Sequence, residues 1–171
     1  VMESTFLQLF LRSLGASNLL IGLVPTMFSA GLAASALAAG RLTAHLGRKR
    51  TAVIVVHLSS ALPILLLGLI LRAGDLGSST LGVFFLFYAL FSLGIGLILP
   101  VWQNYLAKIF SPKRSVPALA VMWMAQSMAK IVGSYVILRA VEHSAFALRS
   151  VSLIFILVGG VFIAGSLPFL I

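Results

Sequence analysis

Few side chains in this sequence could carry out chemistry. The 171 residues include 3 acidic residues, 3 histidines and no cysteine. No two carboxylates are spaced for general acid–base catalysis, no cluster has metal-ligand spacing, and no glycine-rich phosphate loop follows a strand. The sequence therefore predicts a protein that is not an enzyme, with no catalytic residues, no metal site and no cofactor.

One group of polar residues does share a helix face. Trp123, Gln126, Ser127, Lys130 and Ser134 follow one another at intervals of three or four residues, so a helix would place them on the same side. A cation in the middle of an apolar run is costly against lipid. We therefore expect Trp123, Gln126, Lys130 and Ser134 to line a cavity for a substrate or coupling ion. The alternative is that Lys130 only forms a structural ion pair.

An acidic residue near the start of the sequence could meet this lysine. Lys130 lies eight residues before Leu138, about 12 Å along a helix, and Glu3 lies nine residues before Arg12, about 13.5 Å. The similar depths lead us to expect Glu3 and Lys130 in the same cavity, where they could pair. An unpaired intramembrane lysine would favour an anionic substrate, whereas a pair would remove that preference.

Other polar side chains inside apolar segments are less informative. Gln103 and its neighbour Asn104 could contact a substrate, or their amides could be solvated at the membrane interface. His57 is a lone histidine, which is more often a packing residue than a proton relay. Gln103 is therefore kept as a candidate cavity residue.

Membrane-spanning helices must position these side chains. Hydrophobic residues make up 61% and charged residues 9% of the chain, against about 45–50% and about 25% in soluble domains, and the mean hydropathy is +1.17. A span needs about 20 apolar residues, and the alternation typical of strands is absent. The sequence predicts an all-α polytopic membrane bundle of about six transmembrane helices. They cover residues 1–14, 19–40, 51–71, 80–109, 116–138 and 148–171, the first of them truncated.

Basic residues predict the orientation of this bundle. The net charge is +9, from 12 Lys and Arg residues against 3 acids. In a soluble chain this charge would suggest nucleic acid, but here it belongs at loop ends, so no nucleic-acid partner is expected. One side holds Arg41, Arg48, Lys49, Arg50, Lys108, Lys113 and Arg114, and the other holds Arg12, Arg72, Arg139 and Arg149. The positive-inside rule predicts that loops 41–50 and 108–115 are cytoplasmic, in the cell (inner) membrane.

Small residues recur along three of the expected helices. Such stripes allow close helix packing in membranes, and we expect that role for each of them. The stripes are Gly22, Thr26, Ser29, Ala33, Ala36 and Gly40; Ala89, Ser92, Gly96, Pro100 and Gln103; and Ser152, Gly159 and Ser166.

Residues 40–50 resemble a loop motif of the major facilitator superfamily, Gly-x-Leu-Ala-Asp-Arg-x-Gly-Arg-Lys, between the second and third helices of that family. The matching residues are Gly40, Leu42, Gly47, Arg48 and Lys49. The chain departs from the motif at the acidic position, which is Ala44, and at the next basic position, which is His45. In the family that acid joins a charge network that stabilises one conformation, so the resemblance implies a weaker or differently built network here.

A second stretch, residues 96–114, resembles a poorly characterised bacterial branch of the same superfamily. It has a Pro-x-Trp-Gln helix end at Pro100, then Leu-Ala-Lys ending at Lys108, then a loop with Pro112 and Arg114. The arginine motif of the drug-antiporter branches is missing, since residues 92–96 contain no arginine, and their Gly-Pro motif is missing, since Gly133 is not followed by proline. This argues against a standard proton-driven drug exporter.

The resemblance implies a particular architecture and activity. Family members have twelve helices in two halves that rock about a central site, so residues 1–171 would be a single N-terminal bundle of a larger transporter. The expected function is secondary active transport of a small solute by alternating access. The expected partners are that solute, a coupling proton or ion, the lipid bilayer and the missing C-terminal half. The alternative is a non-transporting membrane scaffold or assembly protein.

Overall fold

The described residues of the chain are almost entirely helical. The computed structural model describes residues 5–43, 49–74, 76–142 and 146–170, and within them there is no strand. Two short 3₁₀ helices accompany six α-helices. In chain order the elements are α1 (Thr5–Ser13), α2 (Asn18–Thr43), α3 (Lys49–Ala73), η1 (Gly77–Ser79), α4 (Thr80–Ile109), α5 (Pro112–Glu142), α6 (Leu148–Ser166) and η2 (Leu167–Leu170).

The predicted fold class is confirmed, with corrections at several helix ends. Among the described residues, five helices are long and apolar enough to span a membrane, and the described part of α1 has nine residues. The predicted span 80–109 matches α4. The predicted loop 41–50 is too long, because α2 continues to Thr43 and α3 begins at Lys49. The predicted span 116–138 is too short for α5, and the sixth span ends its α-helix at Ser166.

The first helical connection follows from local hydrogen bonding. Gly15 has φ +79°, a left-handed conformation that glycine adopts without strain. The amides of Gly15 and Ala16 donate to the carbonyls of Arg12 and Leu11, as in a Schellman motif at a helix end. The hydroxyl of Ser17 then accepts from the amide of Leu20 at 3.4 Å and caps α2.

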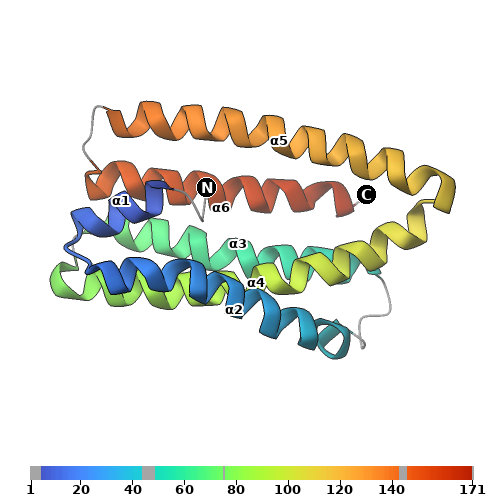
Figure 1. The fold of residues 1–171 in the computed structure, drawn as a ribbon, viewed down its shortest axis with the longest axis horizontal. Helices are drawn as coiled ribbons and strands as arrows, with labels where there is room; N and C mark the ends of the chain where they lie inside the picture. The colour runs from blue at the N-terminus through green and yellow to red at the C-terminus, as the bar shows by residue number, and fades with distance from the viewer. Residues whose placement is uncertain (1–4, 44–48, 75, 143–145, 171) are drawn as a thin grey trace.

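The helices run up and down along one long axis (Figure 1). The last residues of α1, α3 and α5 lie at one end with the first residues of α2, α4 and α6. Arg41, Arg50 and Lys108, at or near the last or first turns of their helices, therefore share the opposite end. This agrees with the predicted grouping of basic residues.

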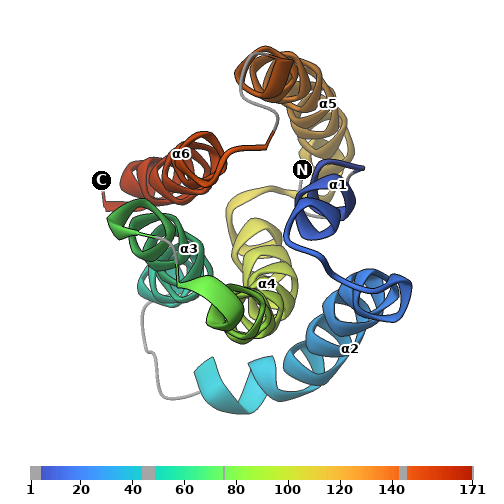
Figure 2. The ribbon, with the colours of Figure 1, turned by 90° about the vertical axis from the view of Figure 1, so that its left-hand side faces the viewer.

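Helix α4 lies between α2 and α3 when the bundle is viewed along its helices (Figure 2). A Cβ atom built on Gly96 would lie 2.6 Å from the carbonyl oxygen of Leu32, and one on Gly94 would lie 2.8 Å from the Cα of Ser60. Only glycine permits such an approach of backbones. The stripe in residues 80–109 therefore packs as expected at Ser92 and Gly96, both of which are buried.

Helix α6 packs against α3 by the same means. A Cβ on Gly159 would lie 2.8 Å from the amide nitrogen of Leu65, and one on Gly68 would lie 2.7 Å from the amide nitrogen of Ile156. Ser152, Gly159 and Ser166 are all buried, so the packing role predicted for this third stripe is confirmed.

The stripe predicted in α2 does not pack within the described chain. Gly22, Thr26, Ser29, Ala33 and Gly40 are exposed, and nothing lies within 4 Å of a Cβ built on Gly22 or Gly40. The contact face of α2 instead carries Gly31, Ser35 and Ala39, which are buried against α4 and its neighbours. The prediction failed because two sets of small residues lie on α2, and spacing alone does not identify the set that meets another helix.

Aromatic rings join the short α1 to the long helices. The ring of Phe10 lies 6.0 Å from that of Phe84 on α4 and 5.9 Å from that of Phe155 on α6, both edge to face. Phe84 also stacks on Tyr88 at 5.5 Å. All four rings are fully buried, and burial of aromatic side chains contributes strongly to packing. This cluster fixes α1 against α4 and α6 at one end of the bundle.

Candidate functional site

Helix α5 is the least buried of the long helices. In the most apolar stretch of 18 residues between Lys113 and Val141, no residue is buried. In the corresponding stretch of α3, 39% of the residues are buried. Figure 2 places α5 at the periphery, beyond α1 and α6. Trp123, Gln126, Lys130 and Ser134 are all exposed, and Trp123 is 63% exposed. Four of the predicted cavity residues thus lie on one helix that the rest of the described chain leaves largely uncovered.

The polar residues lie on or beside the face of α5 that is turned towards the bundle, and all of them remain exposed. Ile137 and Ala140 pack against the aromatic core, and Met122 and Gly133 are half-buried on the same helix face. At about 100° per residue, Gln126 lies at the centre of this face. Lys130, Trp123 and Ser134 lie about 40°, about 60° and about 80° from Gln126, all to the same side, at the same turn per residue.

Lys130 lies far from either end of its helix. It is 18 residues after Pro112 and 12 before Glu142, or about 27 Å and about 18 Å along the axis. Helix α5 as a whole extends about 46 Å at the same rise, more than the hydrocarbon core of about 30 Å. A hydrocarbon core centred on α5 would therefore contain the backbone of Lys130.

Two other polar groups on α5 are bonded within the helix. The hydroxyl of Ser127 donates to the carbonyl oxygen of Trp123 at 2.8 Å. Near the opposite end from Pro112, Nε of Arg139 donates to the hydroxyl of Tyr135 at 3.1 Å, and the guanidinium lies 5.3 Å from the centre of that ring. Such a cation–aromatic pair at the end of a span suits the membrane interface.

Gln103 lies at a different depth from Lys130. It is exposed on α4, six residues before Ile109, or about 9 Å from the end at which α5 begins. Lys130 lies about 27 Å from that end. The two side chains therefore belong to different levels of the bundle, and Gln103 could meet a solute only at another point on its path. Glu3 lies outside the described residues.

The residues of the loop motif lie mainly in helix ends. Gly40 and Leu42 belong to the last turn of α2, and Lys49 is the first residue of α3. Gly47 and Arg48 lie outside the described residues. Arg41 is exposed in the last turn of α2, where a cation interacts favourably with the helix dipole.

His57 is a packing residue in this structure. Its Nδ1 donates to the carbonyl oxygen of Val53 at 2.8 Å, and its ring lies 5.8 Å from that of Phe169. Phe169 also meets Tyr105 at 5.5 Å. Tyr105 and Trp102 pack against a second buried cluster that includes Ala39, Val53 and Val101.

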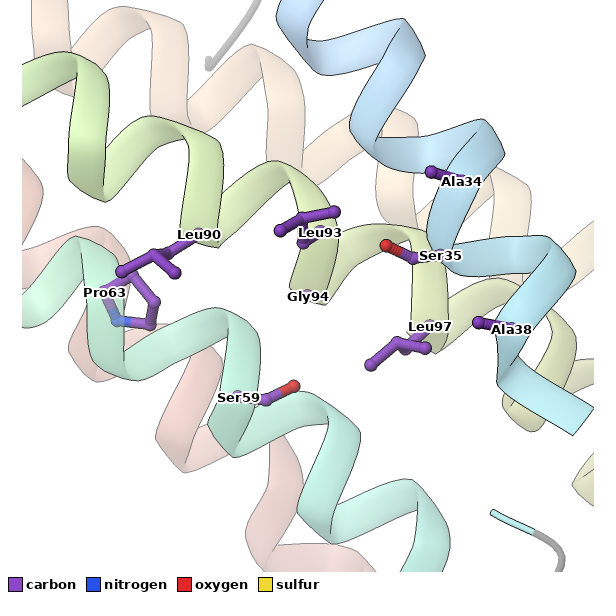
Figure 3. A pocket seen from close by; sticks show the side chains of 9 residues that line it. All are labelled: Ala34, Ser35, Ala38, Ser59, Pro63, Leu90, Leu93, Gly94 and Leu97. Carbon is purple, nitrogen blue, oxygen red and sulfur yellow. The ribbon is translucent and has the colours of Figure 1, made fainter. Parts of the chain in front are cut away.

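One feature was not found from the sequence. A groove of about 440 Å³ lies where α2 and α3 flank the middle of α4, and Figure 3 shows its lining side chains. Its residues come from three helices, so no local spacing indicates it. Among the described residues there is no group of three or more His, Cys, Asp or Glu side chains that could hold a metal.

These features define a class of protein, namely a multi-pass helical membrane protein with small-residue helix contacts and a polar helix face at the depth of the membrane. The sequence model of the protein family named Major Facilitator Superfamily matches residues 3–171 of the chain. The chain belongs to this superfamily of membrane transporters. Neither a curated protein nor a solved structure matches it.

Proposed function

We propose that this chain is the N-terminal six-helix half of a secondary active transporter that moves a small solute by alternating access. One observation carries the proposal: a spanning helix, α5, carries a lysine and an amide at membrane depth, and the described chain leaves both side chains exposed. Contact of these polar groups with lipid hydrocarbon costs free energy. A cavity shared with a second half would solvate them.

The packing of the helices supports a cavity or a further contact beside α5, because the described chain gives this helix few neighbours. Superfamily halves contain two inverted three-helix repeats, in which α1 corresponds to α4, α2 to α5 and α3 to α6. Helix α4 has 30 residues and packs against α2 and α3. Helix α1 has nine and already meets α6 through Phe10 and Phe155. In such a repeat the counterpart of the contact between α4 and α2 is one between α1 and α5, so we propose that Glu3 and Lys130 face the same cavity, as their positions in the sequence lead us to expect.

The class of substrate depends on whether Glu3 pairs with Lys130. If Glu3 does not neutralise Lys130, the ammonium group favours a small organic anion, with Gln126 and Ser134 as further hydrogen-bond donors and Trp123 as an apolar wall. If the two residues pair, they would instead form a charge switch for a coupling proton or ion. We assign Lys130 to the transport step in either case.

Transport by reconstituted full-length protein tests this assignment. Vesicles would be screened for uptake of small carboxylates and organic phosphates, and Lys130→Gln and Glu3→Gln would be measured on the best substrate. We expect Lys130→Gln to lower uptake by at least about tenfold, because a hydrogen bond to a charged group contributes about 1.5–3 kcal/mol. Lys113→Gln, at the exposed start of α5, is the matched control and should transport normally.

Two outcomes would contradict the proposal. Full uptake by both Lys130→Gln and Glu3→Gln would remove the site from the transport path. A full-length protein that captures a partner but moves no solute would favour the alternative, a membrane scaffold or assembly factor.

A further inference from the structure

The groove beside α4 has no part in the proposed transport path. It is lined by small side chains of α2, including Ala34 and Ala38, by Ser59 and Pro63 of α3, and by leucines of α4. Leu90 and Leu93 on its wall are 45% and 44% exposed, so the groove is open to the surroundings of the bundle. Figure 3 shows the side chains of Leu93 and Leu97 between α2 and α3.

The close helix contacts explain why this hollow exists. Gly31 on α2 brings that helix against Ser92, and Gly94 brings α4 against Ser60 of α3. The small residues that permit these approaches leave little side-chain volume above α4. The groove has a volume of about 440 Å³, which lies within the range of small-molecule sites, about 300–1,000 Å³. In a bilayer, an open apolar groove must be filled to keep dispersion contacts, and the hydrocarbon chains of lipids surround it.

The depth of the groove matches a single leaflet. Ala38 and Ala34 lie three and seven residues before Arg41, or about 4.5 Å and about 10.5 Å along α2. Half of the hydrocarbon core is about 15 Å. A lipid chain that enters from the Arg41 end would therefore reach along the groove towards the middle of α4.

A basic residue, Arg41, lies in the last turn of α2, beyond the end of the groove that Ala38 lines. Ala34, Ala38 and Arg41 follow one another at i, i+4 and i+7, so the three side chains share one face of α2. Arg41 is exposed in the last turn of the helix. A guanidinium forms paired hydrogen bonds with phosphate oxygens, and basic residues next to a span attract anionic lipids.

We propose that this groove binds one acyl chain of an anionic phospholipid, drawn from the leaflet at the Arg41 end, with its headgroup held by Arg41. The apolar wall selects a hydrocarbon chain over a polar ligand, and the charge of Arg41 selects the headgroup. The site is structural or regulatory and is separate from the polar face of α5.

Photo-crosslinking in vesicles tests the site on the full-length protein. The probe is phosphatidylglycerol with a diazirine on its acyl chain, and labelled peptides are mapped by mass spectrometry. We expect the label to concentrate several-fold on residues 34–38 and 90–97. Excess unlabelled phosphatidylglycerol should compete better than phosphatidylcholine.

Paired variants separate the chain site from the headgroup site. Ala34→Phe fills the groove and should reduce labelling there several-fold, whereas Ala164→Phe, at an exposed alanine of α6, should not. Arg41→Gln should remove the advantage of phosphatidylglycerol over phosphatidylcholine, and Arg72→Gln, at the opposite end, should preserve it. If Ala34→Phe fails to fold, the competition on the unmodified protein still decides.

Three results would overturn the proposal. The first is label spread evenly over the outer faces of all helices. The second is equal competition by both lipids on the unmodified protein. The third is absence of label together with cross-links from the groove to another protein segment, which would identify a second half or a second copy as the occupant.

Discussion

At the scale of single residues, two neighbouring glycines have opposite surroundings. A Cβ on Gly159 would lie 2.8 Å from both the backbone nitrogen and the Cβ of Leu65, while nothing lies within 4 Å of one on Gly160. The backbone of α3 cannot move aside cheaply, so Gly159→Ala should destabilise the bundle. Overpacking typically costs about 1–3 kcal/mol, more than the helix propensity gained from alanine, about 0.5–1 kcal/mol.

Thermal unfolding of the purified protein in detergent would measure this effect. The midpoint should fall for Gly159→Ala and should stay level or rise for Gly160→Ala. Equal midpoints for the two variants would mean that α3 and α6 are not in close contact at this position.

Residue types alone predicted part of this picture. The spacing of Ser152, Gly159 and Ser166 predicted a packing face, and the structure confirms it. The same reasoning failed for Gly22 and Gly40, which are exposed. A helix bears several stripes of small residues, and the one that packs depends on neighbours distant in the sequence.

At the scale of elements, α5 is the helix whose environment is least determined by the described chain. The sequence predicted its existence and its polar stripe, because apolar length and helical spacing are local properties. It did not predict that both sides of the helix would be exposed, with Met128 at 66% and Val132 at 62%. Charge and hydration must therefore distinguish a side facing a cavity from a side facing lipid.

Cysteine substitution can separate these two sides of α5. Residues 1–171 contain no cysteine, so a thiol introduced there reports without background once any cysteine in the rest of the full-length protein has been replaced. Ser134 and Val132 lie on opposite sides of the helix, about 160° apart at 3.6 residues per turn. Ser134→Cys should react several-fold faster with a water-soluble thiol reagent than Val132→Cys, because the reactive thiolate needs a polar environment.

The comparison requires both variants to be folded, as judged by their elution from a sizing column. Equal and slow reaction at both positions would place the polar stripe in a dry protein contact. Lys130 would then only form a structural ion pair, which is the alternative that the sequence leaves open.

At the scale of the whole molecule, the two ends of the bundle carry different numbers of basic residues. Helix alternation brings Arg41, Arg50 and Lys108 to one end and Arg12 and Arg72 to the other. The sequence could predict this grouping because each span reverses the direction of the chain. It could not predict that α4 would lie between α2 and α3, since that arrangement depends on contacts such as Gly96 with Leu32.

The charge difference leads to a prediction about orientation in the cell membrane. The end that carries more Lys and Arg in its short loops should be cytoplasmic. Ser111, between α4 and α5, and Ser78, in η1, are exposed at opposite ends of the bundle. In intact cells, a membrane-impermeant maleimide should label Ser78→Cys and leave Ser111→Cys unlabelled until the membrane is permeabilised. The reverse pattern would place the Arg41 end outside, and the anionic lipid proposed for the groove would then come from the outer leaflet.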